Sequence, residues 1–341
     1  MDKTFNFNEV DEEVFEQEFD QNYDDQFKQA NDQLESNILI ALVGDVNCGK
    51  SSTINKLMDG EIVSTGAKPG ETVEIKEIQY TDKIVFVDTP GLDDINKENS
   101  QVTLDYYKKS DVILFFTNAA GTVLSENELK NLKEIEKTNK NIIIVLNKID
   151  AAEDIGGLVQ YIQQATNYVY PVTPISSRTG ENIGMLQKEL LKILEEKQKD
   201  ILMARELKDK STTANRWINS AGLASAAIGA SPIPGSDIIP LTGIQVGLII
   251  KLSLLYDKPV SKESAKELLI ATIVGNAGKT AFRQLVKLVP GAGWAVGAGV
   301  ASAATIALGY AVKYMHEHNI ELTAEQLKFV YNMFLNKEKS K

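Results

Sequence analysis

The most constraining feature of the chain is the segment Gly44–Ser51, which reads G-D-V-N-C-G-K-S and follows the apolar run 38–43. A helix-compatible stretch, 52–58, comes next, so the segment has the strand–loop–helix setting of a phosphate-binding loop. Its glycines let backbone N–H groups form a concave nest, to which a helix start adds positive potential. We expect Lys50 to reach the β- and γ-phosphates and the Ser51 hydroxyl to bind Mg²⁺. The residues predicted to bind nucleotide here are Asp45, Val46, Asn47, Cys48, Gly49, Lys50, Ser51 and Ser52.

Charge is spread unevenly over the 341 residues. Residues 1–37 have 12 acids and 2 lysines, a net charge of −10, whereas residues 201–341 have 10 acids and 16 bases, a net charge of +6. Residues 38–200 are mildly acidic, with a net charge of −7. These shifts predict an acidic amphipathic helical arm (1–36), a nucleotide domain (37–200) and an Ala/Gly-rich helical domain (201–341).

The numbers of cysteines and histidines limit the cellular compartment and the metal sites that can be expected. Cys48 is the single cysteine, which excludes a disulfide framework, and the start of the chain has no signal-peptide pattern. We therefore expect a cytoplasmic protein, or one bound peripherally at the inner face of a membrane. His316 and His318 are the two histidines, and we expect them to be exposed on a helix rather than to hold zinc.

Residues 38–200 alternate strand-like apolar runs with helical patterns, which predicts an α/β domain with a mostly parallel, six-stranded sheet. Ligands of such sheets bind at the carboxyl ends of the strands, where the phosphate loop falls. The predicted strands are 38–44, 73–80, 83–88, 111–117, 141–147 and 172–176. The predicted helices are 50–59, 98–109, 125–138, 152–167 and 181–197.

Two later strand ends complete the predicted nucleotide site. The first ends in D-T-P-G, where Asp88 is placed to hold Mg²⁺ through water and the Gly91 N–H to approach the γ-phosphate. The second ends in N-K-I-D, where Asp150 is placed to accept hydrogen bonds from N1–H and N2–H₂ of guanine. Adenine lacks this donor pair and would leave the carboxylate unpaired, so the acid selects guanine. Around the base, Asn147 is expected to brace the loop, Lys148 to lie over the ring, and Ser176, Ser177 and Arg178 to contact the guanine carbonyl through their backbone.

With these motifs in this order, residues 37–200 resemble the Era-like branch of the translation-factor-related GTPases. The resemblance implies GTP and GDP as ligands, Mg²⁺ as cofactor, and a switch threonine between the first helix and the second strand. Thr72 is preferred for that role, because it lies in Pro-Gly-Glu-Thr just before strand 73–80; Thr65 is the alternative. The predicted metal ligands are thus Ser51, Thr72 and Asp88, and the predicted catalytic residues are Lys50, Thr72, Gly91 and Asn47.

Slow intrinsic hydrolysis is expected, because Leu92 occupies the position at which Ras-like enzymes have a water-orienting glutamine. The resemblance offers K⁺ bound near Asn47, or a homodimer through the nucleotide domains, as the missing stimulus. In the alternative, Asn47 only stabilises its loop. Asp93 and Asp94 are weaker candidates for orienting the water.

The second half has long uncharged stretches, including 217–236 and 288–312, rich in Ala and Gly. Two Pro-Gly motifs lie next to apolar stretches, S-P-I-P-G-S-D at 231–237 and V-P-G-A-G at 289–293. With these motifs, residues 211–315 resemble a bacterial helical domain of unassigned function that accompanies Era-like GTPases. Three interpretations stay open: a soluble bundle, reversible insertion into an anionic membrane, and permanent membrane spans. Residues 181–210 fit one long charged helix or two helices in sequence.

The acidic arm has an apolar stripe at helical spacing, formed by Phe15, Phe19, Tyr23, Phe27, Ala30 and Leu34. We expect this helix to pack on the helical domain of its own chain, with partner docking as the alternative. The chain as a whole is predicted to be a GTP-hydrolysing switch whose nucleotide state controls contact of the helical domain with a membrane or a protein. The alternative is a dynamin-like or immunity-related membrane-remodelling GTPase. No nucleic-acid partner is expected, since no KH-type loop or dense basic patch is present.

Overall fold

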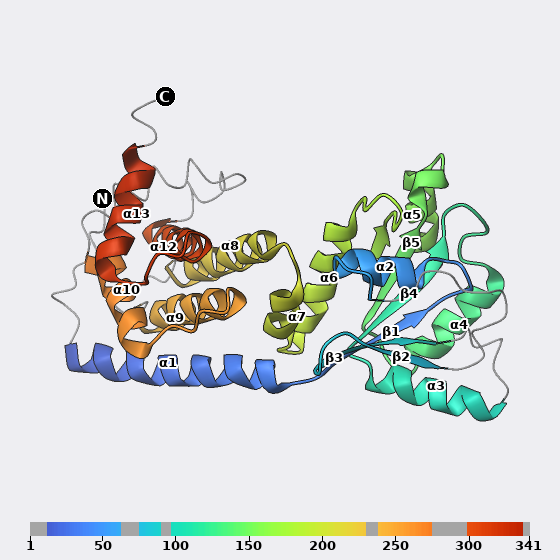
Figure 1. Cartoon of the computed structure of the whole chain (residues 1–341), viewed down its shortest axis with the longest axis horizontal. Coiled ribbons are helices and arrows are strands. Elements are labelled where there is room, and N and C mark those ends of the chain that lie inside the picture. The colour runs from blue at the N-terminus through green and yellow to red at the C-terminus, as the bar shows by residue number, and fades with distance from the viewer. Residues whose placement is uncertain (1–11, 63–74, 90–96, 230–237, 275–298, 337–341) are drawn as a thin grey trace. The chain divides into compact units, whose positions relative to one another are not determined.

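The structure is a computed structural model, and it describes residues 12–62, 75–89, 97–229, 238–274 and 299–336. Contacts within the chain divide it into two units. We call Gln33–Lys208 the α/β unit, and Met1–Asp32 together with Asp209–Lys341 the helical unit. Figure 1 shows the sheet of the first and the helices of the second.

The α/β unit contains a six-stranded sheet in the order β2-β3-β1-β4-β5-β6. Its strands are β1 (Ile38–Val43), β2 (Lys76–Gln79), β3 (Ile84–Asp88), β4 (Val112–Asn118), β5 (Ile142–Asn147) and β6 (Val172–Pro174). All neighbours pair in parallel except β2 and β3, which are antiparallel. The central strands β1, β4 and β5 are apolar up to their carboxyl ends, as expected where both faces of a sheet are covered. This confirms the predicted fold class.

Helices cover both faces of this sheet (Figure 1). They are α2 (Lys50–Leu57), α3 (Lys97–Lys109), α4 (Glu126–Glu136), α5 (Ile155–Ala165) and α6 (Ile183–Glu196). The last helix of this unit, α7 (Asp200–Glu206), packs on α6. One buried cluster joins the sheet to α3, α4 and α5 through Tyr107, Ile135 and Ile162, while α6 contacts β4 and β5. The segment 181–210 is two helices, α6 and α7, and Gln198 between them has a positive φ of 56°.

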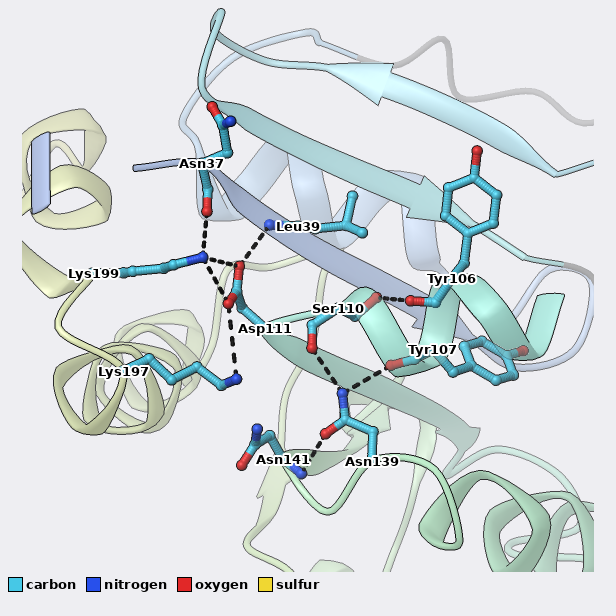
Figure 2. Close-up of polar contacts among 10 residues, drawn as sticks. All are labelled: Asn37, Leu39, Tyr106, Tyr107, Ser110, Asp111, Asn139, Asn141, Lys197 and Lys199. Carbon is cyan, nitrogen blue, oxygen red and sulfur yellow. Dashed lines mark hydrogen bonds and ion pairs between the residues drawn. The ribbon is translucent and has the colours of Figure 1, made fainter. Parts of the chain in front are cut away.

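Asp111 lies at the amino end of β4, the end of the sheet opposite the phosphate loop, and forms several polar contacts there (Figure 2). The residue is 7% exposed. Its Oδ2 accepts a 3.0 Å hydrogen bond from the backbone N–H of Leu39 at the start of β1. Lys199 Nζ lies 2.9 Å from both carboxylate oxygens and also donates to the carbonyl of Asn37. Lys197 adds an ion pair at 3.8 Å. One carboxylate therefore joins the segment that enters the sheet to the segment that follows α6.

A second polar side chain at this edge, Asn139, caps the end of α3 (Figure 2). Its Nδ2 donates to the carbonyls of Tyr107 and Ser110 at 2.8 and 2.7 Å. Its Oδ1 accepts from the N–H of Asn141 at 2.9 Å. Carbonyls at and just after a helix end lack the full set of intrahelical donors, so this buried amide supplies a donor to each of the two.

The helical unit contains α1 (Glu12–Glu35, up to residue 32), α8 (Lys210–Gly229), α9 (Ile238–Leu255), α10 (Lys262–Val274), α12 (Gly299–Glu317) and α13 (Ala324–Asn336). Helix α12 packs closely on α8 and α9. A Cβ on Gly309 of α12 would lie 2.7 Å from Ile218 of α8, so only glycine permits this approach. A buried polar seam crosses the same interface, because Thr305 Oγ1 is hydrogen bonded to Ser225 at 2.9 Å and to Gln245 at 3.0 Å.

Helix α1 packs on the other helices of this unit, as its apolar stripe predicted. Phe15, Phe19 and Tyr23 are buried, and Tyr23 donates a 2.6 Å hydrogen bond to the carbonyl of Val260. Its acidic side faces lysines of α10: Lys262 pairs with Asp24 at 2.8 Å, and Lys266 pairs with Glu16. Both termini of the chain therefore contribute to one helical unit.

The prediction of two exposed histidines is wrong for His316, which is 3% exposed on α12. Its Nε2 lies 3.0 Å from Ser253 Oγ of α9, and its ring stacks on Tyr256 at 5.6 Å. The sequence pattern alone did not show which face of α12 would be turned to the core.

None of the helices in the described part of the chain combines the length and apolar character needed to span a bilayer. The two Pro-Gly motifs at 231–237 and 289–293 lie outside the described residues.

Candidate nucleotide-binding site

The phosphate loop connects β1 to α2 and is held in shape by left-handed backbone positions. Gly44, Asn47 and Gly49 have φ values of 144°, 65° and 97°. A side chain at Gly49 would also collide with the Nδ2 atom of Asn147. Asparagine tolerates the left-handed region better than most residues, which gives Asn47 a conformational reason to be present. The loop therefore requires these residue types before any ligand is considered.

Lys50 places a positive charge at the centre of the loop. Its Nζ donates to the carbonyls of Gly44 and Asp45 at 2.7 and 3.1 Å and lies 3.6 Å from Asp88 Oδ1. The side chain is only 8% exposed. Helix α2 begins at Lys50, so the ammonium group and the helix N-terminus both favour anions at one place.

Asp88 ends β3, directly beside β1, with which it is paired at Leu42. Its Oδ1 is buried and has no hydrogen-bond partner. Burial raises the pKa of this carboxyl, and the nearby Lys50 opposes that shift. A buried oxygen of this kind suits a water-mediated contact with Mg²⁺, and Ser51 at the start of α2 supplies a hydroxyl. Mg²⁺ usually keeps several waters and needs few protein ligands.

Among the residues that the structure describes, no group of three or more histidine, cysteine or acidic side chains is arranged to hold a metal ion. The other predicted ligand, Thr72, lies outside the described residues, as do Gly91, Thr65, Leu92, Asp93 and Asp94. Their predicted roles stay predictions.

Asn147 joins the two halves of the site. Its Nδ2 donates to the carbonyl of Cys48 at 2.8 Å and to Ser177 Oγ at 3.1 Å, and its Oδ1 accepts from the N–H of Ser177 at 3.0 Å. The side chain is fully buried. The phosphate loop and the segment after β6 are thus fixed to the end of β5 by one amide.

Asp150 lies in a short 3-10 turn, Ile149–Ala151, just after β5. Its Oδ1 accepts a 2.6 Å hydrogen bond from Ser176, and its Oδ2 lies 2.6 Å from Arg178 Nη2. The hydrogen bond from Ser176, followed by the charge of Arg178, holds the pKa of Asp150 below its usual range. Asp150 is therefore ionised at neutral pH and acts only as an acceptor.

The remaining predicted residues lie on the surface of the same loops. Lys148 has a left-handed φ of 64° and is half-buried, as are Ser51 and Ser52, whereas Asp45, Val46 and Asn47 are exposed. Cys48 differs, because burial raises the pKa of its thiol to about 11. That thiol is a packing group, not a nucleophile.

Sequence reasoning missed Thr89, which follows Asp88 and is fully buried. Its Oγ1 donates to the carbonyl of Leu42 at 2.9 Å and lies 3.0 Å from the hydroxyl of Tyr107 on α3. The threonine thereby ties the end of β3 to β1 and α3. Its position in D-T-P-G was visible, but the tyrosine partner is 18 residues away and carried no local signal.

The fold and this arrangement define a P-loop nucleotide-binding domain. Residues 39–148 match the family model described as a 50S ribosome-binding GTPase. The α/β unit is therefore similar to the GTPase domains of the Era-like family.

The following similar proteins match only part of this chain. GTPase Era of Aquifex aeolicus is 30% identical over 170 residues, which cover 46% of this chain and 56% of Era. GTPase Der of Nautilia profundicola is 27% identical over 170 residues, which cover 48% of this chain and 36% of Der. A solved structure of Era in complex with MgGDPNP and nucleotides of 16S ribosomal RNA is 22% identical, with a TM-score of 0.40, covering 59% of this chain and 70% of that one. The chain spans about half or less of the length of these two curated relatives.

Proposed function

We propose that the protein is a GTP-binding and GTP-hydrolysing molecular switch. The observation that carries the proposal is the ionised Asp150 placed by Ser176 and joined, through Asn147 and Ser177, to the phosphate loop. The two oxygens of a carboxylate can accept from two N–H donors. Guanine presents such a pair, N1–H and N2–H₂, on nitrogens bonded to the same carbon, whereas adenine does not.

The test of ligand choice is a direct binding measurement. The full chain with Mg²⁺ is titrated with fluorescent GDP, GTP, ADP and ATP. Guanine nucleotides should bind roughly 100-fold or more tightly than adenine nucleotides, because adenine has no pair of N–H donors to offer to the carboxylate. Equal affinity for the two bases would contradict the proposal.

Hydrolysis would rest on positioning and charge, as in other phosphoryl transfers. Lys50 would neutralise the β- and γ-phosphates, and the Gly91 N–H would sense the γ-phosphate. Mg²⁺, held by Ser51, Thr72 and, through water, Asp88, would neutralise charge that develops on the phosphate oxygens. With Leu92 in place of a glutamine, no side chain at that position polarises the water, so the intrinsic rate would be slow.

A monovalent cation or a second copy of the chain would supply the missing stimulus. The proposed K⁺ position is beside Asn47, which is exposed on the phosphate loop. Asn47→Gly permits the same left-handed conformation and removes the side-chain amide, so it separates the cation role of the amide from the backbone conformation of the loop. We expect the wild-type rate to rise in K⁺ relative to Na⁺ and the variant to lose that rise. Equal rates in both salts, with any dimer intact, would remove K⁺ from the proposal.

The output of the switch would be contact of the helical unit with an anionic membrane or a protein partner. Support comes from the net charge of +6 over residues 201–341, which favours anionic surfaces. Flotation of the full chain with liposomes, with GTP analogue, GDP or no nucleotide, tests this. Nucleotide-dependent binding without tubulation supports the switch, tubulation or polymers support a dynamin-type remodeller, and flotation in no state contradicts membrane contact. A gel-shift titration with ribosomal RNA tests the expectation that no nucleic acid binds.

A further inference from the structure

Arg178 lies where a guanine base would contact Asp150. Of the two carboxylate oxygens, Oδ1 accepts from Ser176 Oγ and Oδ2 is paired with Arg178 Nη2, each at 2.6 Å. A guanidinium group and the N1–C2–N2 fragment of guanine have the same chemical pattern, in which one carbon bears nitrogen donors that point the same way. The arginine thus makes, from within the chain, a contact that the base would make.

The loop that carries Arg178 is built to present it there. The N–H of Ser176 donates to the carbonyl of Glu181 at 3.1 Å, and the N–H of Gly180 donates back to the carbonyl of Ser176 at 2.8 Å. Ser176 Oγ also accepts from the N–H of Thr179 at 3.1 Å, so its single proton is directed to Asp150. The closed loop holds the backbone of residue 178 beside the carboxylate.

The side chain of Arg178 is nevertheless easy to displace. It is 77% exposed, whereas that of Asp150 is 12% exposed. An exposed ion pair contributes little, because solvent already stabilises a released arginine. Ser176 is fully buried and stays in place. The Ser176 hydroxyl therefore holds the Asp150 carboxylate in place, whereas the Arg178 side chain covers the carboxylate and can move away from it.

We infer that Arg178 competes with guanine for Asp150 and so lowers nucleotide affinity by a small factor. The inference rests on the proposed function, since it concerns how the same site takes its base. A site that is free for only part of the time binds its ligand more weakly by that fraction. For a pair this exposed, we expect removal of the arginine to tighten GDP binding by about two- to fivefold.

The experiment measures association, dissociation and affinity of fluorescent GDP with the full chain and its Arg178→Ala variant. The variant should bind about two- to fivefold more tightly, mainly through faster association, because the carboxylate is then free. The matched control is Lys137→Ala, which removes one positive charge and an exposed ion pair with Glu134 on α4, outside the site. That control should leave GDP binding unchanged.

A second pair of variants separates competition from a general effect of charge. Asp150→Asn presents one acceptor and one donor, which matches xanthine in place of guanine and no longer pairs with an arginine ionically. In this background, Arg178→Ala should leave the affinity for fluorescent XDP unchanged within twofold. If XDP binding tightens as much as GDP binding did, the arginine acts by another route and the inference is overturned.

Unchanged or weaker GDP binding by the single variant Arg178→Ala would also overturn the inference and leave the proposed function standing. If the wild-type chain bound neither GDP nor GTP, the proposed function would fall first. The two failures are therefore distinguishable in one set of titrations.

Discussion

Two aspartates at the carboxyl edge of the sheet have opposite shifts in pKa, and each shift suits a different task. Burial raises the pKa of Asp88, whose Oδ1 has no hydrogen-bond partner and lies 3.6 Å from Lys50 Nζ. Donation from Ser176 and the charge of Arg178 lower the pKa of Asp150. The first carboxylate lacks a partner that a hydrated cation would supply, and the second is kept ionised to accept donors from a base.

At the scale of single residues, Gly49→Ala tests two needs of the phosphate loop: the positive φ at this position, and the room that a Cβ would take from Asn147. Its φ is 97°, and a Cβ there would collide with the Asn147 amide. Gly180 is a matched control, because its φ is 87° but a Cβ there would meet nothing within 4 Å. Gly180→Ala should cost about 1–2 kcal/mol of unfolding free energy from backbone strain alone.

Gly49→Ala should cost more than this control and should also abolish nucleotide binding, because Asn147 must move. Urea unfolding and GDP titration of both variants provide the measurement. If both variants lost the same stability and Gly49→Ala still bound GDP, the Asn147 side chain could move aside without harm to the fold or to nucleotide binding.

At the scale of single elements, helix α1 is held by its aromatic stripe more than by its charges. Phe15, Phe19 and Tyr23 are buried, and neighbouring rings lie 5.5 to 6.4 Å apart along Phe15, Phe19, Tyr23 and Phe27. The ion pairs of Lys262 and Lys266 with α1 are exposed at their acidic ends. Exposed pairs contribute about 0 to 1 kcal/mol each, whereas loss of a buried phenylalanine costs about 3–5 kcal/mol.

Phe19→Ala is therefore expected to lower the unfolding free energy of the helical unit by about 3–5 kcal/mol. The double variant Glu16→Gln, Asp24→Asn should lower it by no more than about 2 kcal/mol, and less in high salt. Phe329→Ala on α13, where the ring is 58% exposed, controls for loss of an aromatic side chain. A larger effect of the charge variant than of Phe19→Ala would reverse this ranking.

The buried His316 gives the helical unit a pH dependence. Burial, with a smaller contribution from Lys258, lowers the pKa of His316 to about 4. Ser253 and Tyr256 contact its ring, and the Tyr256 hydroxyl donates to Glu317. The unfolded chain would protonate it near pH 6.5, so stability is fully present above that pH and is lost as the pH falls towards 4.

Urea unfolding at pH 7 and pH 4.5 tests this. The loss attributable to His316 over that range should be about 2–3 kcal/mol. His316→Gln keeps a partner for Ser253 without a titrating group and should reduce the loss by that amount. Identical pH dependence of the two proteins would mean that the ring is protonated in the folded state or reaches water.

Much of the sheet was predictable because β1, β3 and β5 are apolar runs that end in motifs. The differences have local causes: α5 starts at Ile155 and not near 152, because the Asp154 side chain accepts from the N–H of Gly157 and caps the helix. The contacts of Arg178 with Asp150, Thr89 with Tyr107 and Lys199 with Asp111 join residues 18 to 88 positions apart. Such contacts depend on which side chains the fold brings together, and residue spacing in the sequence does not predict them.

At the scale of the whole molecule, the division into two units predicts two unfolding transitions. A ligand that binds only the folded α/β unit stabilises that unit, by about 2.7 kcal/mol at a concentration 100 times its Kd. Calorimetry with and without GDP should therefore shift one transition upward and leave the transition of the helical unit in place. A single transition, or an equal shift of two, would mean that the units unfold together.

The contacts of Asp111 have a consequence for how the chain is assembled from modules. The strand that begins the nucleotide module and the segment that ends it are bonded to the same carboxylate through Leu39 and Lys199. The helical unit supplies the residues on both sides, Met1–Asp32 and Asp209–Lys341. The α/β unit is thus an insertion in the sequence of the helical unit, and its two ends lie close together. Domains with adjacent ends are the kind that can be removed from one protein and inserted into another. The helical unit is correspondingly discontinuous, and its first helix is synthesised before the α/β unit while its partners follow after it.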